Sequence, residues 1–254
     1  EPISGVDLGT LDKGKQDRFY RLVDQTLQSP CGKAHSLRTS LTSDDSCKRA
    51  PFAAKYVVAM LEDEASDSDL IKAYEARYKQ VAPKTFQLSD EVPHLGPSDA
   101  PVKLVEFFDY GCPACREFAP IVKEAVSDFP NDAVVFFKQY PLPSHPDSKP
   151  AAQAALAAAK QGKFMEMHEM LFLKSRQHKK SDLLEHAKSL GLDMTKFESD
   201  FAAAKALVEA DVAEGDRVGV SATPTTFING RPYEGPWHPR YLKMWIEEEL
   251  AVNR

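Results

Sequence analysis

The segment VEFFDYGCPACREFAP, residues 105–120, is an apolar run that opens onto two cysteines, Cys112 and Cys115. The run belongs to residues 102–108, which are apolar except at two charged positions. That pattern predicts a central strand covered on both faces. An amphipathic pattern begins at the cysteines and predicts a helix. The segment therefore predicts a strand that leads directly into a helix with a CxxC motif at its start.

The residues before this segment predict a separate helical domain. Residues 1–82 contain three amphipathic helical patterns, and Cys31 and Cys47 flank a polar loop between the first two. Four prolines in residues 83–101 interrupt any periodicity and predict a linker. We therefore expect an N-terminal three-helix domain over residues 1–82 and a second domain over residues 83–254.

The second domain has the pattern of an α/β fold with a helical insertion. Residues 133–140 repeat the buried-strand pattern, and residues 148–218 are helical almost throughout. Asn229-Gly230 predicts a hairpin turn, and residues 239–250 predict a last helix. A strand, a helix, a strand, a helical block, a hairpin and a final helix make an α/β domain.

Composition and charge exclude several classes of protein. The chain has 254 residues, of which 43% are hydrophobic, and a formal net charge of −6. No nucleic-acid partner is expected, because nucleic-acid-binding proteins favour a basic stripe. No apolar run approaches the roughly 18 residues that suggest a membrane span. The chain starts at Glu1 rather than at Met, which fits a mature exported form after removal of a signal peptide.

Three kinds of chemistry compete for Cys112 and Cys115. A zinc site would need two more ligands at short spacing, but Cys31 and Cys47 lie outside this strand–helix unit, so no metal is expected. A structural bridge within a CxxC motif would close a very small loop and remove little chain entropy. A redox pair is favoured, because backbone N–H groups at the start of a helix stabilise the thiolate form of Cys112.

The remaining parts of a redox centre can be assigned from their positions. Cys115 lies one helical turn after Cys112, where it would resolve a mixed disulfide. Pro113 suits the first position of a helix. Glu106 lies within the buried strand and could relay a proton to Cys115; the alternative is an acid paired with a lysine, Lys103 or Lys138.

The segment VSATPTTFING places Thr223 and Pro224 directly before a predicted strand. In a domain that resembles thioredoxin, a proline at this place is cis and faces the CxxC motif, and we expect the same of the Thr223–Pro224 bond; the alternative is a proline that only begins an edge strand. His145 follows YPLPS in a loop that could approach the cysteines, although solvation at the surface is the favoured interpretation.

The segments GPSDAPVKLVEFFDYGCPACREFAP, HPDSKPAAQAA and GVSATPTTFINGRPYEG, in this order, resemble the DsbA-like thiol–disulfide oxidoreductases. That family has a thioredoxin-like fold with an all-helical insertion, and the resemblance covers residues 83–254. It implies these roles: Cys112 as nucleophile, Cys115 as resolving thiol, Thr223 and Pro224 as the cis-proline pair that binds substrate, and Glu106 as the buried acid. The Pro113-Ala114 dipeptide differs from the Pro-His of the best-known oxidase of the family, so the net redox direction stays open.

The resemblance implies an enzyme that exchanges disulfides with exported proteins in the periplasm or another extracytoplasmic compartment. We expect a dithiol oxidase without a cofactor that acts on exported or unfolded protein substrates. Its membrane redox partner would be quinone-linked or would supply a thiol reductant. One alternative is a disulfide isomerase or reductase whose N-terminal domain forms a homo-oligomer. Another is a non-catalytic chaperone or partner-binding protein with a vestigial CxxC motif.

Cys31 and Cys47 are expected to form a structural disulfide that links the first helix to the second. Closing a loop of this size contributes about 3 kcal/mol in the chain-entropy model. The alternative is a second redox pair that passes electrons to or from Cys112 and Cys115.

Overall fold

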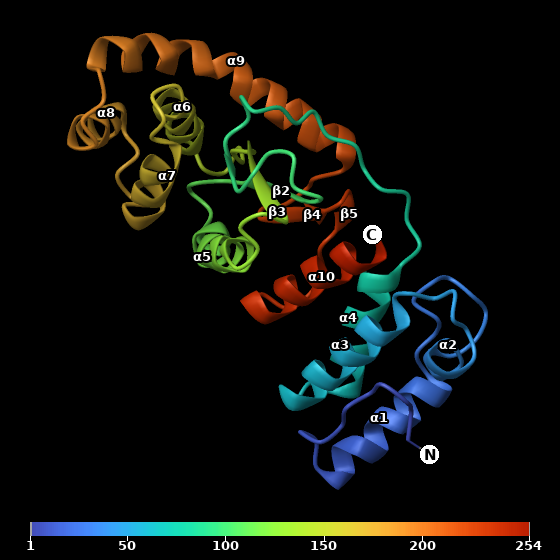
Figure 1. Cartoon of the computed structure of the whole chain (residues 1–254). Helices are drawn as coiled ribbons and strands as arrows, with labels where there is room; N and C mark the ends of the chain where they lie inside the picture. The colour runs from blue at the N-terminus through green and yellow to red at the C-terminus, as the bar shows by residue number, and fades with distance from the viewer. Residues whose placement is uncertain (1, 254) are drawn as a thin grey trace. The chain divides into compact units, whose positions relative to one another are not determined.

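The computed structural model describes residues 2–253, which form two compact units (Figure 1). The first unit contains the residues through Ala82 together with those from Tyr233 onward, and the second is Pro83–Pro232. The division between Ala82 and Pro83 falls where the predicted linker begins. Residues 233–254, which the sequence analysis placed in the second domain, group by their contacts with the N-terminal helices. Their assignment to the second domain stays a prediction.

The first unit is helical. Its elements are α1 (Lys13–Gln25), α2 (Leu37–Thr42), α3 (Ala50–Glu62), α4 (Asp67–Tyr78) and α10 (Pro239–Val252). The three predicted helices are α1, α3 and α4, and among the described residues the structure adds the short helix α2, which was not predicted. Ser36 caps α2 by accepting a hydrogen bond from the Thr39 N–H, and Leu37 is buried. The cap and the burial therefore make helical a part of the loop whose polar composition predicted irregular structure.

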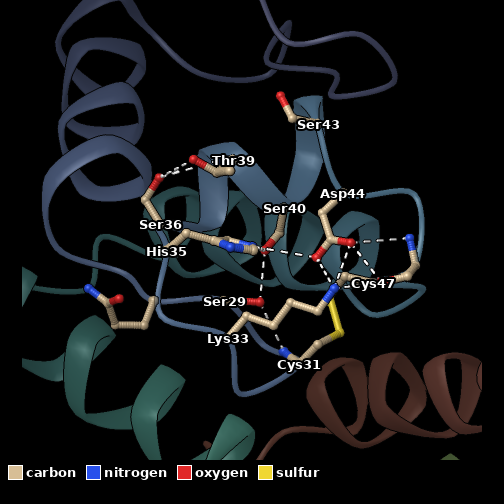
Figure 2. Close-up of polar contacts among 12 residues, drawn as sticks. Ser29, Cys31, Lys33, His35, Ser36, Thr39, Ser40, Ser43, Asp44 and Cys47 are labelled. Atoms are coloured by element: carbon tan, nitrogen blue, oxygen red, sulfur yellow. Dashed lines mark hydrogen bonds and ion pairs between the residues drawn. A yellow bond between two sulfur atoms is a disulfide. The ribbon is translucent and has the colours of Figure 1, made fainter.

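Cys31 and Cys47 are joined by a disulfide, as predicted, with their Cα atoms 5.8 Å apart (Figure 2). Cys47 is buried in the core of the first unit, and Cys31 packs against that core. The bond therefore ties the segment that follows α1 to the start of α3.

A buried ion pair lies in the core of the first unit. The Arg77 Nη2 atom is 2.6 Å from Glu248 Oε2, and Arg49 Nη1 is 2.6 Å from Glu248 Oε1. Arg77 also lies over the ring of Tyr56, 4.6 Å from its centroid. Removing charges from water is costly, and the second cation and the aromatic face offset part of that cost. Arg77 of α4 and Glu248 of α10 thus join the two ends of the chain within this unit.

A five-stranded mixed sheet forms the centre of the second unit. Its strands are β1 (His94–Leu95), β2 (Val102–Phe108), β3 (Ala133–Gln139), β4 (Thr225–Ile228) and β5 (Arg231–Pro232), in the order β1-β3-β2-β4-β5. Strands β2 and β3 are parallel, and β4 pairs with the other side of β2 in the antiparallel direction. Nearly every residue of β2 and β3 is buried, as the two apolar runs predicted. The turn between β4 and β5 has positive φ at Asn229 and Gly230, which confirms the predicted hairpin.

Helices accompany this sheet, and all but the first of them form the predicted insertion. They are α5 (Pro113–Ser127), α6 (Ser148–Ala159), α7 (Phe164–Leu173), α8 (Lys180–Ser189) and α9 (Met194–Val218). Figure 1 shows α6, α7 and α8 grouped beside the long helix α9, whereas α5 connects β2 to β3. This connection brings the start of α5, and with it the CxxC motif, to the end of the central strand β2.

Candidate active site

Cys112 is the N-cap residue of α5. Its backbone is extended, and its N–H donates a 3.0 Å hydrogen bond to the Asp109 carbonyl oxygen, which fixes the turn between strand and helix. Pro113 takes the first helical position, where no N–H is needed. The exposed fraction is 8% for Cys112 and 0% for Cys115, so Cys112 is the more exposed of the two.

Cys115 lies one turn into α5, and both thiols are free. Burial raises the pKa of the Cys115 thiol well above its ordinary value, and a hydrogen bond from the Asp109 N–H, 3.4 Å from the sulfur, acts in the opposite direction without overcoming it. A buried thiol with a raised pKa retains its proton unless a neighbouring base removes it.

The Thr223–Pro224 peptide bond is cis, as the sequence predicted. The Cys112 thiol donates a hydrogen bond to the Thr223 carbonyl oxygen at 3.4 Å. Strand β4 begins at the next residue, Thr225, and pairs with β2, so the sheet itself places the Thr223 backbone against the start of α5. Residues 111 positions apart in the sequence therefore meet at one sulfur atom.

Glu106 lies in β2 and is 1% exposed. The alternative in which this acid is paired with Lys138 was wrong, because the Lys138 Nζ atom instead lies 3.0 Å from carboxylate oxygens of both Asp211 and Glu214. Within residues 2–253, neither carboxyl oxygen of Glu106 has a hydrogen-bond partner. Burial raises the pKa of Glu106 to about 8, so it is protonated at neutral pH and can exchange its proton close to that pH.

Asp109 is a site residue that the sequence analysis missed. Its buried carboxylate accepts hydrogen bonds from the N–H groups of Gly111, at 2.7 Å, and Leu142, at 2.9 Å. The ring of His145 lies 2.6 Å from the same carboxylate. The favoured interpretation of His145 as a solvated surface residue was therefore wrong: it is half-buried and paired. An acid placed directly after a buried strand was the available signal, since such a group needs partners.

Gly111 allows the loop that contains His145 to approach the cysteines. Its N–H also donates to the Ser148 hydroxyl oxygen at 3.0 Å. A Cβ atom at position 111 would lie 2.5 Å from that oxygen and 2.8 Å from the His145 Cβ atom. Only glycine fits this contact without displacing the loop.

A serine, a histidine and an aspartate also meet near the disulfide of the first unit (Figure 2). The Ser40 Oγ atom is 3.0 Å from His35 Nε2, and Asp44 Oδ2 is 3.5 Å from the same ring nitrogen. A catalytic triad needs the aspartate on the other nitrogen, so that the histidine is oriented while Nε2 faces the serine. The cluster lacks that geometry.

Among residues 2–253, no group of three or more histidine, cysteine, aspartate or glutamate side chains has an arrangement that could hold a metal ion. In the same range, no helix combines the length and the apolar composition needed to span a membrane.

Residues 89–248 match the family model described as Thioredoxin. Over 162 residues the chain is 39% identical to the Na(+)/H(+) antiporter NhaA 3 of Salinispora tropica, an alignment that covers 63% of this chain and 25% of the antiporter. The chain therefore spans only a quarter of the length of that curated relative.

Solved structures show the same fold. A thioredoxin-like oxidoreductase from Silicibacter pomeroyi superposes with a TM-score of 0.54 at 28% identity, covering 65% of this chain and 94% of the other. BdbD from Bacillus subtilis, in its oxidised form, superposes with a TM-score of 0.56 at 28% identity, covering 66% and 98%. The second unit has the mixed sheet, the CxxC motif at the start of α5 and the cis-proline opposite it. The chain thus has a thioredoxin-like fold with a helical insertion and belongs to the thioredoxin family.

Proposed function

We propose that this protein is a protein disulfide oxidoreductase that oxidises exported or unfolded proteins through Cys112 and Cys115. The observation that carries the proposal is the position of Cys112. It is the more exposed of two adjacent thiols, it caps a helix, and it lies against the carbonyl of the residue before a cis-proline. Such a backbone segment, Thr223-Pro224, can hold an extended client strand beside the reactive sulfur.

The chemistry begins with Cys112 and Cys115 joined as a disulfide. A client thiolate attacks the Cys112 sulfur, the bond between the two cysteines breaks, and its electron pair leaves with Cys115. A second client thiolate then attacks the client sulfur of the mixed disulfide, and that bond's electron pair leaves with Cys112. The client gains one disulfide and gives up two electrons, which reside in the two reduced cysteines.

Glu106 supplies the proton for the first step. Burial raises the pKa of the Cys115 thiol above that of Glu106, which itself rises to about 8. Proton transfer from the carboxyl group to the departing Cys115 thiolate is therefore favourable. In the reverse direction, the ionised carboxylate is the buried base that can remove the Cys115 proton.

The disulfide between Cys31 and Cys47 supports an extracytoplasmic location, since such bonds persist in oxidising compartments. We assign it a structural role, because Cys47 is buried in a helical core. A membrane redox partner would then return Cys112 and Cys115 to the disulfide form. In this scheme the helical domain of residues 1–82 accompanies a catalytic domain of residues 83–254.

A disulfide-transfer experiment tests the proposal. Oxidised full-length protein is mixed with a reduced peptide that contains two cysteines, and mass spectrometry follows both molecules. The wild type should transfer one disulfide per molecule, Cys112→Ala should transfer none, and Cys115→Ala should retain the peptide when it starts as a mixed disulfide. Equal inactivity of the wild type and Cys112→Ala would overturn the proposal. A reduction potential close to about −270 mV rather than about −120 mV would favour a reductase over an oxidase.

A further inference from the structure

A groove of about 600 Å³ lies between α5 and α7 in the second unit. One wall is a stripe on α5, and the other is a stripe on α7 that includes Met165 and Phe172. Phe137 and His168 are lining residues and are each only 3% exposed. Burial lowers the pKa of His168 to about 3, so this ring is uncharged at neutral pH. The groove is therefore apolar and without charge at its deepest points.

The groove begins close to the reactive cysteine. Arg116, at one end of the α5 stripe, donates its backbone N–H to the Cys112 carbonyl oxygen at 3.2 Å, and residues four apart lie on the same face of a helix. Tyr110, two residues before Cys112, contacts the buried His168, with 3.0 Å between the Tyr110 hydroxyl and the ring Nδ1 atom. The turn before Cys112 thus contacts a residue that lines the groove.

The charges are unevenly distributed along the groove. At the far end Lys123 pairs with Glu169. At the end near Cys112, Arg116 donates to the Ser175 hydroxyl at 2.9 Å, which joins it to residues 174–180, KSRQHKK. That segment has four exposed lysine or arginine side chains and no acid, and in the described residues none of the four is in an ion pair. In a chain with a net charge of −6, this end of the groove is locally basic.

Leu173 lines the groove, directly precedes the basic segment in the sequence and is 82% exposed. Two other large apolar side chains among the described residues, Leu207 and Trp237, are also exposed, each at 47%. A solvated leucine at the edge of an apolar groove indicates a surface that a partner covers.

We propose that this groove binds an extended client segment with an acidic residue next to its cysteine and a large apolar side chain about three residues away. The acid would meet Arg116 and the basic segment. Ala119 is about 10 Å along the helix from Cys112, and an extended chain advances about 3.3 Å per residue, which sets the spacing of the apolar side chain. The inference rests on the proposed function and assigns it a class of substrate.

The test compares three reduced peptides with oxidised full-length protein. The first has glutamate next to its cysteine and phenylalanine three residues away; the second has lysine for the glutamate, and the third has serine for the phenylalanine. Glutathione serves as a small thiol that cannot fill the groove. The quantity measured is kcat/KM for disulfide exchange. We expect the first peptide to react about tenfold faster than the third, the factor that burial of one large apolar side chain gives.

Variants of the protein distinguish binding in the groove from differences in the intrinsic reactivity of the peptide thiols. Arg116→Glu should reverse the preference between the glutamate and lysine peptides, and Leu173→Ser should reduce the preference for phenylalanine. Matched controls on α9 are Leu207→Ser, another exposed leucine, and Lys205→Glu, an exposed cation; both should behave as the wild type. If the wild type exchanges with glutathione but reacts equally with all three peptides, the groove has no such role. If it exchanges with neither glutathione nor any peptide, the proposed function itself fails, and the groove proposal with it.

Discussion

Replacing Glu106 with glutamine should change how stability depends on pH. The pKa of this carboxyl group is about 8 in the folded protein, against 4.5 for an unperturbed glutamate. Between these values the folded protein keeps a proton that the unfolded chain releases, so rising pH favours unfolding. From pH 5 to pH 9 the free energy of unfolding should fall by about 4 kcal/mol through this one group, most of it before pH 8.

The assay is urea unfolding of the wild type and Glu106→Gln at pH 5, 7 and 9, with Cys112 and Cys115 reduced. The variant has no proton to release at this position. Its free energy of unfolding, minus that of the wild type, should therefore rise by about 4 kcal/mol over the range. Other titrating groups are common to both proteins and cancel in this difference.

Glu117→Gln is a matched control, because it makes the same substitution at an exposed position on α5. The change with pH should be larger for Glu106→Gln than for this control. The reasoning about Glu106 would be refuted if Glu106→Gln and the wild type lost stability in parallel between pH 5 and pH 9. In that case the carboxyl group would be ionised in the folded protein at neutral pH and could not donate a proton to Cys115.

Three other substitutions test the supporting structure. Asp109→Asn removes an acceptor of hydrogen bonds from two backbone N–H groups and should lower the free energy of unfolding by about 2 kcal/mol in urea titrations. The control is Asp147→Asn, at an exposed helix cap without a side-chain hydrogen bond, which should leave the free energy of unfolding unchanged. Gly111→Ala places a methyl group 2.5 Å from the Ser148 hydroxyl and should slow disulfide exchange by displacing the turn before Cys112; an unchanged rate would contradict that contact. Serine at both Cys31 and Cys47 should lower the free energy of unfolding by about 3 kcal/mol with exchange at Cys112 retained, and loss of exchange in a folded variant would favour a redox role for that pair.

The sequence predicted the parts of this fold whose signals are local. Apolar runs of strand length predicted β2 and β3, and Asn229-Gly230 predicted the hairpin, since these patterns depend on neighbouring residues alone. The position of the CxxC motif after a strand likewise predicted its place at the start of α5.

Features that depend on distant partners were not predictable. The position of Asp109 after a buried strand indicated that it needs partners, but two of them, Leu142 and His145, lie in a loop more than thirty residues away and could not be identified from the sequence. Lys138 was a candidate partner for Glu106, but helix α9 supplies two closer acids. The short helix α2 was missed because a single serine cap and one buried leucine outweigh a polar composition.

The first unit is assembled from segments on both sides of the second unit in the sequence, and this sets an order of events during synthesis. Helices α1 to α4 emerge first, but Trp245, fully buried, and Glu248, the counter-ion of Arg77, belong to the last helix. Until α10 arrives, Arg77 lacks that anion and the helical unit lacks part of its core. The second unit, which is continuous in sequence, is complete by Pro232. A chain that stalls or is cut between Pro232 and α10 would therefore keep the sheet with Cys112 and Cys115 while leaving helices α1 to α4 without their partner helix.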